Sequence, residues 1–336
     1  MKLATYKDGS RDGQLVVVSR DLTQAHYASH VANRLQQVLD DWNFLSPQLQ
    51  DIFDALNAGR ARHAFPFDPA QCMAPLPRAY QWVSAAAYPS HAELLRKAAG
   101  LPALQERAAV PDMVQGAGDA LLGAQDALPC AAEALGLDFA AGVVVITGDI
   151  AQACAPDRAL DGVRLLALYN DATLRSLVSA DGAPGVAGVQ SKCATAFSPV
   201  AITPDELGEG WAKGRVNLPL HTSWNGRKVG QCEAGAGMGT HFGQLLTLLA
   251  RTRPLRAGSI LGAGPVSNSG LEKRGQWSWP QGFHSIAEKC AMETVQDGKA
   301  ATEYLRYGDT VRIEMKDAAG HSLFGAIEQE VVPFDH

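Results

Sequence analysis

The sequence contains no apolar run of about 18 residues, the length that a transmembrane helix requires. Its opening stretch, MKLATYKDGSRDGQ, also lacks the apolar core of a secretory signal. We therefore expect neither a membrane span nor an export signal, and we expect a cytoplasmic location.

Clusters of positive charge are missing as well. The chain carries 29 Lys and Arg against 35 Asp and Glu, a formal net charge of −6, and the basic residues are dispersed. Proteins that bind nucleic acid or anionic membranes through charge gather Lys and Arg in one tract or on one face. We expect no nucleic-acid partner and no membrane partner, and a small molecule as the ligand.

Cysteine is sparse, and no two cysteines are spaced as CxxC, so neither a disulfide scaffold nor a zinc site of the usual kind is predicted. We expect reduced and mostly buried thiols. The six cysteines are Cys72, Cys130, Cys154, Cys193, Cys232 and Cys290.

Several common catalytic signatures are absent. The sequence has no HExxH, no GxSxG, no GxxxxGK[ST] and no EF-hand loop. The glycine-rich stretches 235–239 and 262–264 do not complete GxGxxG, and they are predicted to form turns. Zinc proteases, α/β-hydrolases and nucleotide-binding P-loop proteins are therefore disfavoured.

The 336 residues suggest about two domains, and 46% apolar residues are enough for a sizeable core. In the first part, Leu15 to Val18 reads as a strand, and apolar residues from Val31 to Trp42 follow a helical period. Ser46 and Pro47 predict the start of a second helix, which Asn57 to Gly59 bring to an end. A proline-rich connector follows, and we place a domain boundary near residue 72, giving domains 1–72 and 73–336.

The larger part is predicted to be rich in strands that are not separated by regular helices, which disfavours a doubly wound parallel sheet. We predict an α+β, β-rich fold with a mixed β-roll. The expected strands are 143–147, 164–169, 216–224 with a hairpin turn at Asn225-Gly226, 310–315 and 323–332, and the expected helices are 241–252 and 285–296.

Four segments in this order resemble the fumarylacetoacetate hydrolase family. They are MVQGAGD at 113–119, LDFAAGVVVITGD at 137–149, NDATLR at 170–175 and QSKCATAFSP at 190–199. The stretches GSILGAG at 258–264 and FGAIEQE at 324–330 extend the similarity. It therefore covers nearly the whole chain beyond about residue 70.

This resemblance implies a small β-rich N-terminal domain, a C-terminal mixed β-roll and a homodimer. It also implies hydrolysis of a carbon-carbon bond in a β-diketo acid such as fumarylacetoacetate or an acylpyruvate. In such chemistry a bound Mg²⁺ or Mn²⁺ chelates the diketone and stabilises the leaving enolate. A histidine just after the first metal-site aspartate is the usual base, and a lysine on a later loop helps to stabilise negative charge.

The sequence departs from that pattern at the metal site. The family presents two glutamates at positions i and i+2 of a strand, and these positions read Ala140 and Gly142. The first metal-site aspartate falls at Asp119 or at the neighbouring Ala120, and the histidine position falls near Gln125. Asp171 is retained, whereas a threonine of the family is replaced by Pro265.

The resulting candidates are Asp171 and Asp119 for a metal, Arg175 and Lys192 for the substrate, and Lys192 and Gln125 for catalysis. Each also has a structural interpretation: Asp171 or Asp119 in a turn, Lys192 as a solvated loop cation and Arg175 as an ion-pair partner. The Gln125 amide cannot take a proton and could only orient water.

Three functions remain open from the sequence. The first is a hydrolase that works with a sparse Mg²⁺ or Mn²⁺ site. The second is a catalytically silent family member that binds a keto acid or a protein partner. The third is a decarboxylase or tautomerase of an oxaloacetate-like acid, since the fold alone does not decide the reaction.

Overall fold

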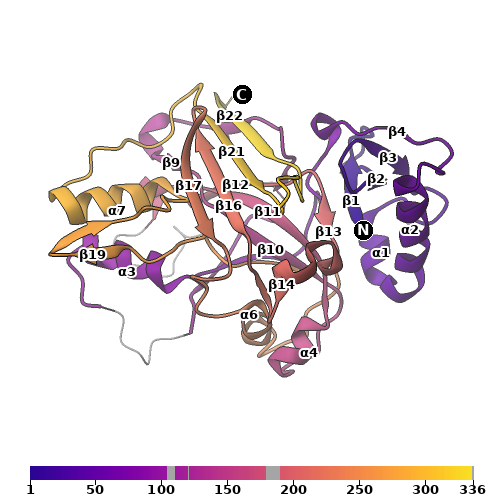
Figure 1. Cartoon of the computed structure of the whole chain (residues 1–336), viewed down its shortest axis with the longest axis horizontal. Coiled ribbons are helices and arrows are strands. Elements are labelled where there is room, and N and C mark those ends of the chain that lie inside the picture. Colours follow the sequence, from indigo (N-terminus) through magenta and orange to yellow (C-terminus); the bar gives the residue numbers. More distant parts are fainter. Residues whose placement is uncertain (104–109, 120, 179–189, 335–336) are drawn as a thin grey trace.

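The computed structural model describes residues 1–103, 110–119, 121–178 and 190–334. An N-terminal unit lies at one end of the molecule, beside a larger unit that contains most of the strands (Figure 1). The N-terminal unit comprises β1 (Lys2–Tyr6), β2 (Gln14–Val18), β3 (Gln24–Tyr27), β4 (Phe65–Pro66), α1 (Leu35–Asp40) and α2 (Trp42–Asn57).

Helix α2 begins earlier than Ser46 and Pro47 predicted. The Asp41 carbonyl already accepts hydrogen bonds from the N–H groups of Phe44 and Leu45, so the first turn is closed before Ser46. Proline lacks an N–H, and Pro47 therefore removes one hydrogen bond near the start of the helix without ending it. The predicted end is confirmed, because Asn57 is the last helical residue.

The main sheet runs through both units. Its order is β4-β3-β2-β1-β13-β11-β10-β18-β5-β6, and β1 pairs with β13 (Ala201–Ile202) of the larger unit. The predicted boundary near residue 72 therefore lies in a segment that connects two parts of one sheet. Its other strands are β5 (Trp82–Ala85), β6 (Met113–Gln115), β7 (Leu121–Leu122), β9 (Leu137–Asp138), β10 (Ala141–Thr147), β11 (Val163–Leu174), β12 (Lys192–Phe197) and β18 (Ile260–Gly262).

A second, five-stranded sheet packs on one face of the main sheet. Its order is β17 (Arg227–Glu233), β16 (Pro219–Trp224), β21 (Thr310–Met315), β22 (Ile327–Pro333) and β8 (Leu128–Cys130). The predicted hairpin between β16 and β17 is confirmed, with Asn225 and Gly226 both at positive φ. The pairing of the last two predicted strands is also confirmed, as β21 with β22.

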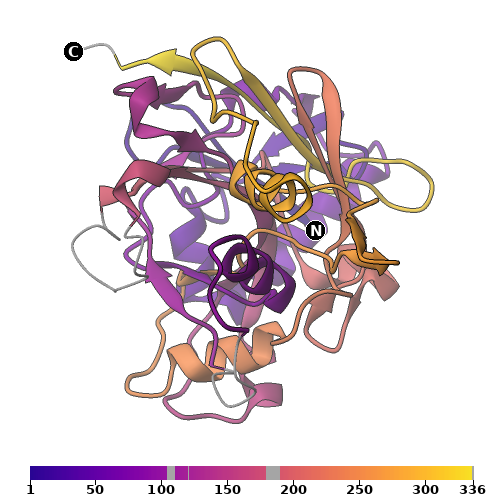
Figure 2. The same cartoon turned by 90° about the vertical axis from the view of Figure 1, so that its left-hand side faces the viewer.

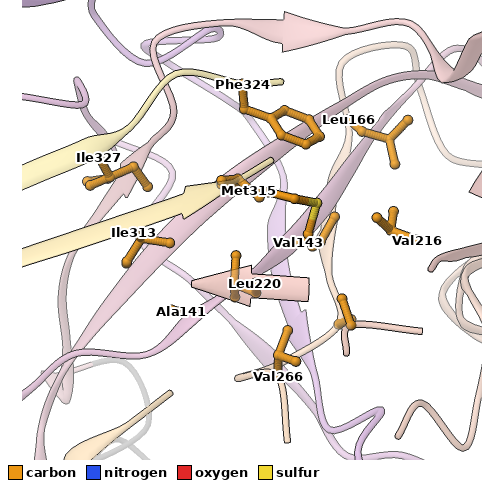
Figure 3. Close-up of a cluster of buried hydrophobic side chains, with 14 of the residues drawn as sticks. Ala141, Val143, Leu166, Val216, Leu220, Val266, Ile313, Met315, Phe324 and Ile327 are labelled. Atoms are coloured by element: carbon orange, nitrogen blue, oxygen red, sulfur yellow. The ribbon is translucent and has the colours of Figure 1, made fainter. Parts of the chain in front are cut away.

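The core follows the two-residue alternation of β10. Val143 and Val145 belong to the apolar cluster shared with the five-stranded sheet, where Leu166, Leu220 and Met315 lie close together (Figure 3). Val144 and Ile146 face the opposite way and belong to the cluster that contains the buried residues of α1 and most of those of α2. Both faces of this central strand are thus covered.

Helices and short hairpins complete the larger unit. Helices α3 and α7 pack side by side (Figure 2), and the predicted helix 285–296 is confirmed as α7, with Ser285 as its N-cap and Gly298, at φ +80°, ending it. These remaining elements are α3 (Pro89–Ala98), α4 (Pro156–Leu160), α6 (Phe242–Leu249), α7 (Ile286–Asp297), β14 (Trp211–Ala212), β15 (Arg215–Val216), β19 (Leu271–Lys273) and β20 (Gln276–Ser278).

The α+β, β-rich fold class is confirmed: two sheets built mainly from antiparallel pairs carry most of the larger unit, and the helices lie outside them. None of the helices in the described ranges is both long enough and apolar enough to cross a membrane.

Candidate functional site

Lys192 and Asp171 form a largely buried ion pair. Antiparallel pairing places Thr195 of β12 opposite Asp171 of β11, and Lys192 opposite Thr173 after a β-bulge. The Lys192 Nζ lies 2.6 Å from Asp171 Oδ2 and 2.9 Å from Thr173 Oγ1. The Asp171 side chain is 2% exposed and that of Lys192 17%. Lys192 is therefore not a solvated loop cation, and Asp171 lies inside a strand rather than in a turn.

Both carboxylate oxygens of Asp171 already have partners. Oδ2 accepts from Lys192, and Oδ1 accepts a hydrogen bond of 3.0 Å from the Thr195 hydroxyl. That hydroxyl in turn accepts from Trp82 Nε1 at 3.1 Å. This network satisfies a charge that would be costly to bury alone.

The two positions that lack glutamates border Asp171 in different ways. The Ala140 carbonyl accepts a hydrogen bond of 2.9 Å from the Asp171 N–H, while Gly142 pairs with Tyr169 across β10 and β11. A Cβ atom on Gly142 would lie 2.5 Å from the Gly264 oxygen and 2.6 Å from Tyr169 Cε1. The Tyr169 ring and a backbone carbonyl therefore occupy the space that a longer side chain at position 142 would need.

Tyr169 belongs to a buried aromatic group. Its ring meets Trp82 edge to face, with centroids 5.2 Å apart, and Trp82 meets Phe197 in the same way at 5.8 Å. Burial raises the pKa of Tyr169 above its ordinary value, so the phenol is neutral. Its hydroxyl has no hydrogen-bond partner of normal geometry among the described residues.

Arg175 acts as a structural ion-pair partner. Its Nε and Nη2 atoms lie 2.8 and 2.7 Å from Oδ2 of Asp138, whose side chain is fully buried. The same carboxylate accepts hydrogen bonds from the N–H groups of Ile286 and Ala287, at 2.6 and 3.1 Å. Asp138 thereby supplies acceptors for the N–H groups in the first turn of α7, where the helix dipole favours a negative charge.

The other two predicted site residues lie apart from this network. Asp119 is exposed in the turn between β6 and β7 and lines a surface hollow together with Arg34 and Arg78. Gln125 is exposed in the turn between β7 and β8. Across the described ranges, the hydrogen bonds of Lys192 and Asp171 include neither of these side chains.

A second polar pair, which the sequence did not reveal, joins α3 and α7. His91 Nδ1 lies 3.0 Å from Oε1 of Glu288, a side chain that is only 1% exposed. Oε2 of Glu288 accepts from the N–H of His284 at 3.2 Å. Burial acts to raise the pKa of Glu288, but the hydrogen bonds, that from His91 foremost, outweigh it and lower the pKa. Glu288 is therefore an anion at neutral pH.

An ionised Glu288 determines which ring nitrogen of His91 is protonated. The carboxylate can only accept, so Nδ1 of His91 donates, and in the neutral form of the ring it is Nε2 that carries the lone pair of a base. The two residues are 197 positions apart in the chain, and only the packing of α3 on α7 brings them together. The local signal was limited to Pro89, Ser90 and His91 at the start of a helix.

The two polar pairs flank the same strand end. Ala140 pairs with Asp171 through its carbonyl on one side, and it forms an isolated β-bridge with Ser285 on the other. Ser285 is the N-cap of α7 and accepts from the N–H of Glu288 at 3.3 Å. These backbone contacts place Lys192 with Asp171 and His91 with Glu288 near the start of β10, and we take the two pairs together as the candidate site.

The residues of this candidate site do not fit a divalent metal ion. Within the part of the chain that the structure describes, no three His, Cys, Asp or Glu side chains lie close enough together to hold one. Ala140 and Gly142 offer no side-chain ligand, and Asp171 is already engaged by Lys192 and Thr195. Mg²⁺ and Mn²⁺ prefer sites built from carboxylate and other oxygen ligands.

Comparison with solved structures supports the fold. A probable 2-hydroxyhepta-2,4-diene-1,7-dioate isomerase from Mycobacterium abscessus is 17% identical, with a TM-score of 0.66 and all of both chains covered. Fumarylacetoacetate hydrolase from Exiguobacterium antarcticum is 16% identical, with a TM-score of 0.67 over 99% of this chain and 100% of that one. Maleylpyruvate hydrolase from Sphingobium sp. SYK-6, solved with manganese(II) and pyruvate, is 14% identical, with a TM-score of 0.64 and full coverage of both chains.

Family models match both units of the chain. Residues 1–78 match the fumarylacetoacetase N-terminal domain 2, and residues 81–332 match the fumarylacetoacetate (FAA) hydrolase C-terminal domain. A search of curated proteins found no significant match. The second family model alone spans well over half of the sequence, and the chain therefore belongs to the fumarylacetoacetate hydrolase family.

Proposed function

We propose that this protein binds a small keto acid at the candidate site and catalyses keto-enol proton transfer on it without a divalent metal. The observation that carries the proposal is the position of the Lys192 ammonium, which is paired with Asp171 beside a strand end that lacks both glutamates. The family includes both hydrolases and isomerases of acylpyruvate-type acids. Proton transfer requires only a base and a donor to the enolate oxygen, whereas hydrolysis also requires a positioned water molecule.

Lys192 is suited to hold negative charge on a substrate oxygen. An ammonium group has three N–H donors, and Asp171 and Thr173 take two of them. The third can be donated to a carbonyl oxygen that becomes an enolate oxygen during the reaction. Because the site is largely buried, this interaction is stronger than it would be in water.

His91 is suited to move the proton. Its Nε2 atom would take a proton from the carbon next to the carbonyl, and the resulting imidazolium would return it to the enolate oxygen or carbon. Glu288 holds the imidazole in the required tautomer through Nδ1 and stabilises the positive charge that forms on the ring. Substrate atoms are conserved, since only the position of one proton changes.

Carbon-carbon hydrolysis of a β-diketo acid, as the resemblance implies, is the second candidate. The His91 and Glu288 pair favours it too, because the same base could deprotonate a water molecule that attacks one carbonyl. The bond to the neighbouring carbon would then break, and Lys192 would hold the enolate that leaves. The pair alone does not distinguish these two reactions.

The test follows enol absorbance and reaction products together. Purified protein is given oxaloacetate, acetylpyruvate or fumarylacetoacetate in EDTA, in Mg²⁺ and in Mn²⁺, and products are identified by NMR. In EDTA, we expect the wild-type protein to make the enol absorbance fall faster than it does without protein, with no cleavage products. The rate with His91→Gln should be at least about a hundredfold lower than with wild type. His321→Gln, a change of an exposed histidine, serves as the matched control.

The other outcomes decide against the proposal in different ways. Acetate and pyruvate formed from acetylpyruvate in EDTA would support the hydrolase candidate. Cleavage that requires added metal would overturn the metal-free reaction, and binding of a keto acid without turnover would identify a silent family member.

We also propose a homodimer, as family membership suggests. The chain has a mass of 35.6 kDa, and light scattering coupled to size exclusion should therefore report about twice that mass. A monomer mass at micromolar concentration would contradict this.

A further inference from the structure

We propose that Lys192 is the resident cation of this site, so that its ammonium takes the place of a divalent metal at Asp171 and the fold excludes the metal. The inference concerns which cation Asp171 holds. It does not depend on turnover, because it can be tested without any substrate.

The first argument is the occupancy of Asp171. Its two oxygens accept from Lys192 at 2.6 Å and from Thr195 at 3.0 Å, and the carboxylate is 2% exposed. A metal ion binding these oxygens would have to share them with the ammonium and with the Thr195 hydroxyl. If the ammonium stayed nearby, it would repel the metal ion across a poorly screened distance.

The second argument is the space beside Asp171. The Trp82 ring lies against two glycines that leave room for it: a Cβ on Gly262 would lie 2.7 Å from the ring, and a Cβ on Gly116 would lie 2.0 Å from it. The Tyr169 ring fills the corresponding place at Gly142. Of these three glycines, Gly142 stands where the family has a glutamate, and the Tyr169 ring leaves no room there for an acidic side chain.

The third argument is the unpartnered hydroxyl of Tyr169. This oxygen lies in the same buried region and has no hydrogen-bond partner of normal geometry among the described residues. A neutral phenol is a poor metal ligand, because the oxygen that binds a metal ion well is the deprotonated one, and burial keeps this phenol protonated. Its presence therefore does not replace the missing glutamates.

The test measures Mn²⁺ binding to the full chain after treatment with a chelator, by electron paramagnetic resonance and by thermal shift. We expect wild-type protein to show no saturable Mn²⁺ binding below about 1 mM, since only one carboxylate is present and it is already paired. Lys192→Gln removes the resident cation but leaves one carboxylate, so its melting temperature should rise only at Mn²⁺ concentrations above about 1 mM and by more than that of wild type. Lys299→Gln, a change of an exposed lysine, should behave as wild type.

Each result bears on the inference. Saturable binding of Mn²⁺ by wild-type protein at micromolar concentration would overturn it, and so would equal Mn²⁺ responses of wild type and Lys192→Gln. Rescue of Lys192→Ala stability by ethylammonium would support it, because the added amine restores a cation at Asp171. If the Lys192 variants do not fold, the wild-type titration decides alone, with saturable binding against the inference and its absence in favour.

Discussion

Two carboxylates near the start of β10 are both buried and both paired with a cation, yet they differ in their other partners. Asp138 accepts from Arg175 and from two backbone N–H groups of α7, so its charge holds the start of a helix. Among the described residues, the Asp171 carboxylate accepts only from side chains, those of Lys192 and Thr195, and it holds no helix in place. Burial of an ion pair therefore does not identify a functional site, whereas a buried pair that holds no backbone element is the better candidate for one.

The largest effect is expected from Asp138→Ala. This change leaves the Arg175 guanidinium without its partner and the first N–H groups of α7 unsatisfied, so we expect a loss of about 3–5 kcal/mol in the free energy of unfolding. Urea denaturation measures it. A loss below about 1 kcal/mol would remove the structural role that distinguishes Asp138 from Asp171.

Lys192→Met should lower the free energy of unfolding by nearly as much, and it should also abolish the proposed binding and turnover of a keto acid. The buried Asp171 carboxylate would lose its cation, at a cost of about 3 kcal/mol. The double variant with Asp171→Asn should recover much of that stability without recovering ligand binding. This double-mutant cycle separates the two roles, and additive losses would show that the pair is not coupled.

The buried His284 predicts a loss of stability in mild acid. Burial lowers its pKa from 6.5 to about 4, and its Nε2 accepts from the N–H of Cys232. The folded state therefore keeps the ring neutral, while below pH 6.5 the unfolded chain gains a proton. Stability due to this group is present above pH 6.5 and falls between pH 6.5 and about 4, by up to about 1.4 kcal/mol per pH unit.

Urea denaturation at several pH values measures this slope, with His284→Gln expected to flatten it and His321→Gln, at an exposed histidine, expected to leave it unchanged. An equal slope in His284→Gln and wild type would assign the acid sensitivity to other groups. The backbone N–H of His284 also donates to Glu288 of α7, so this experiment measures stability in the region around α7.

The smallest effect is expected at the two positions that replace glutamates. Gly142→Ala brings a methyl group against the Gly264 carbonyl and the Tyr169 ring and should cost about 1–3 kcal/mol. Ala140→Ser, which adds one atom to an existing side chain, should cost less. Thermal denaturation compares the two variants. A melting temperature of Gly142→Ala equal to that of wild type would contradict the view that no space is left for a side chain at position 142.

Local chemistry explains what could be predicted of the fold. The glycine that ends α7, the Asn225-Gly226 turn and the β-branched run of β10 each act over a few residues, and each element formed as predicted. The start of α2 was missed, because a proline near a helix start removes only one hydrogen bond. The continuity of the sheet through both units was missed too, since pairing of β1 with β13 leaves no local trace.

The sequence by itself determined the family, the fold class and the residues that cannot bind a metal, because the missing carboxylates at Ala140 and Gly142 follow directly from side-chain chemistry. The tertiary structure alone decided which charges meet. It paired Lys192 with Asp171, placed Arg175 in a structural role, and brought His91 to Glu288 from 197 residues away. The partner of a buried charge is set by the packing of distant strands and helices, and no spacing along the chain encodes that contact.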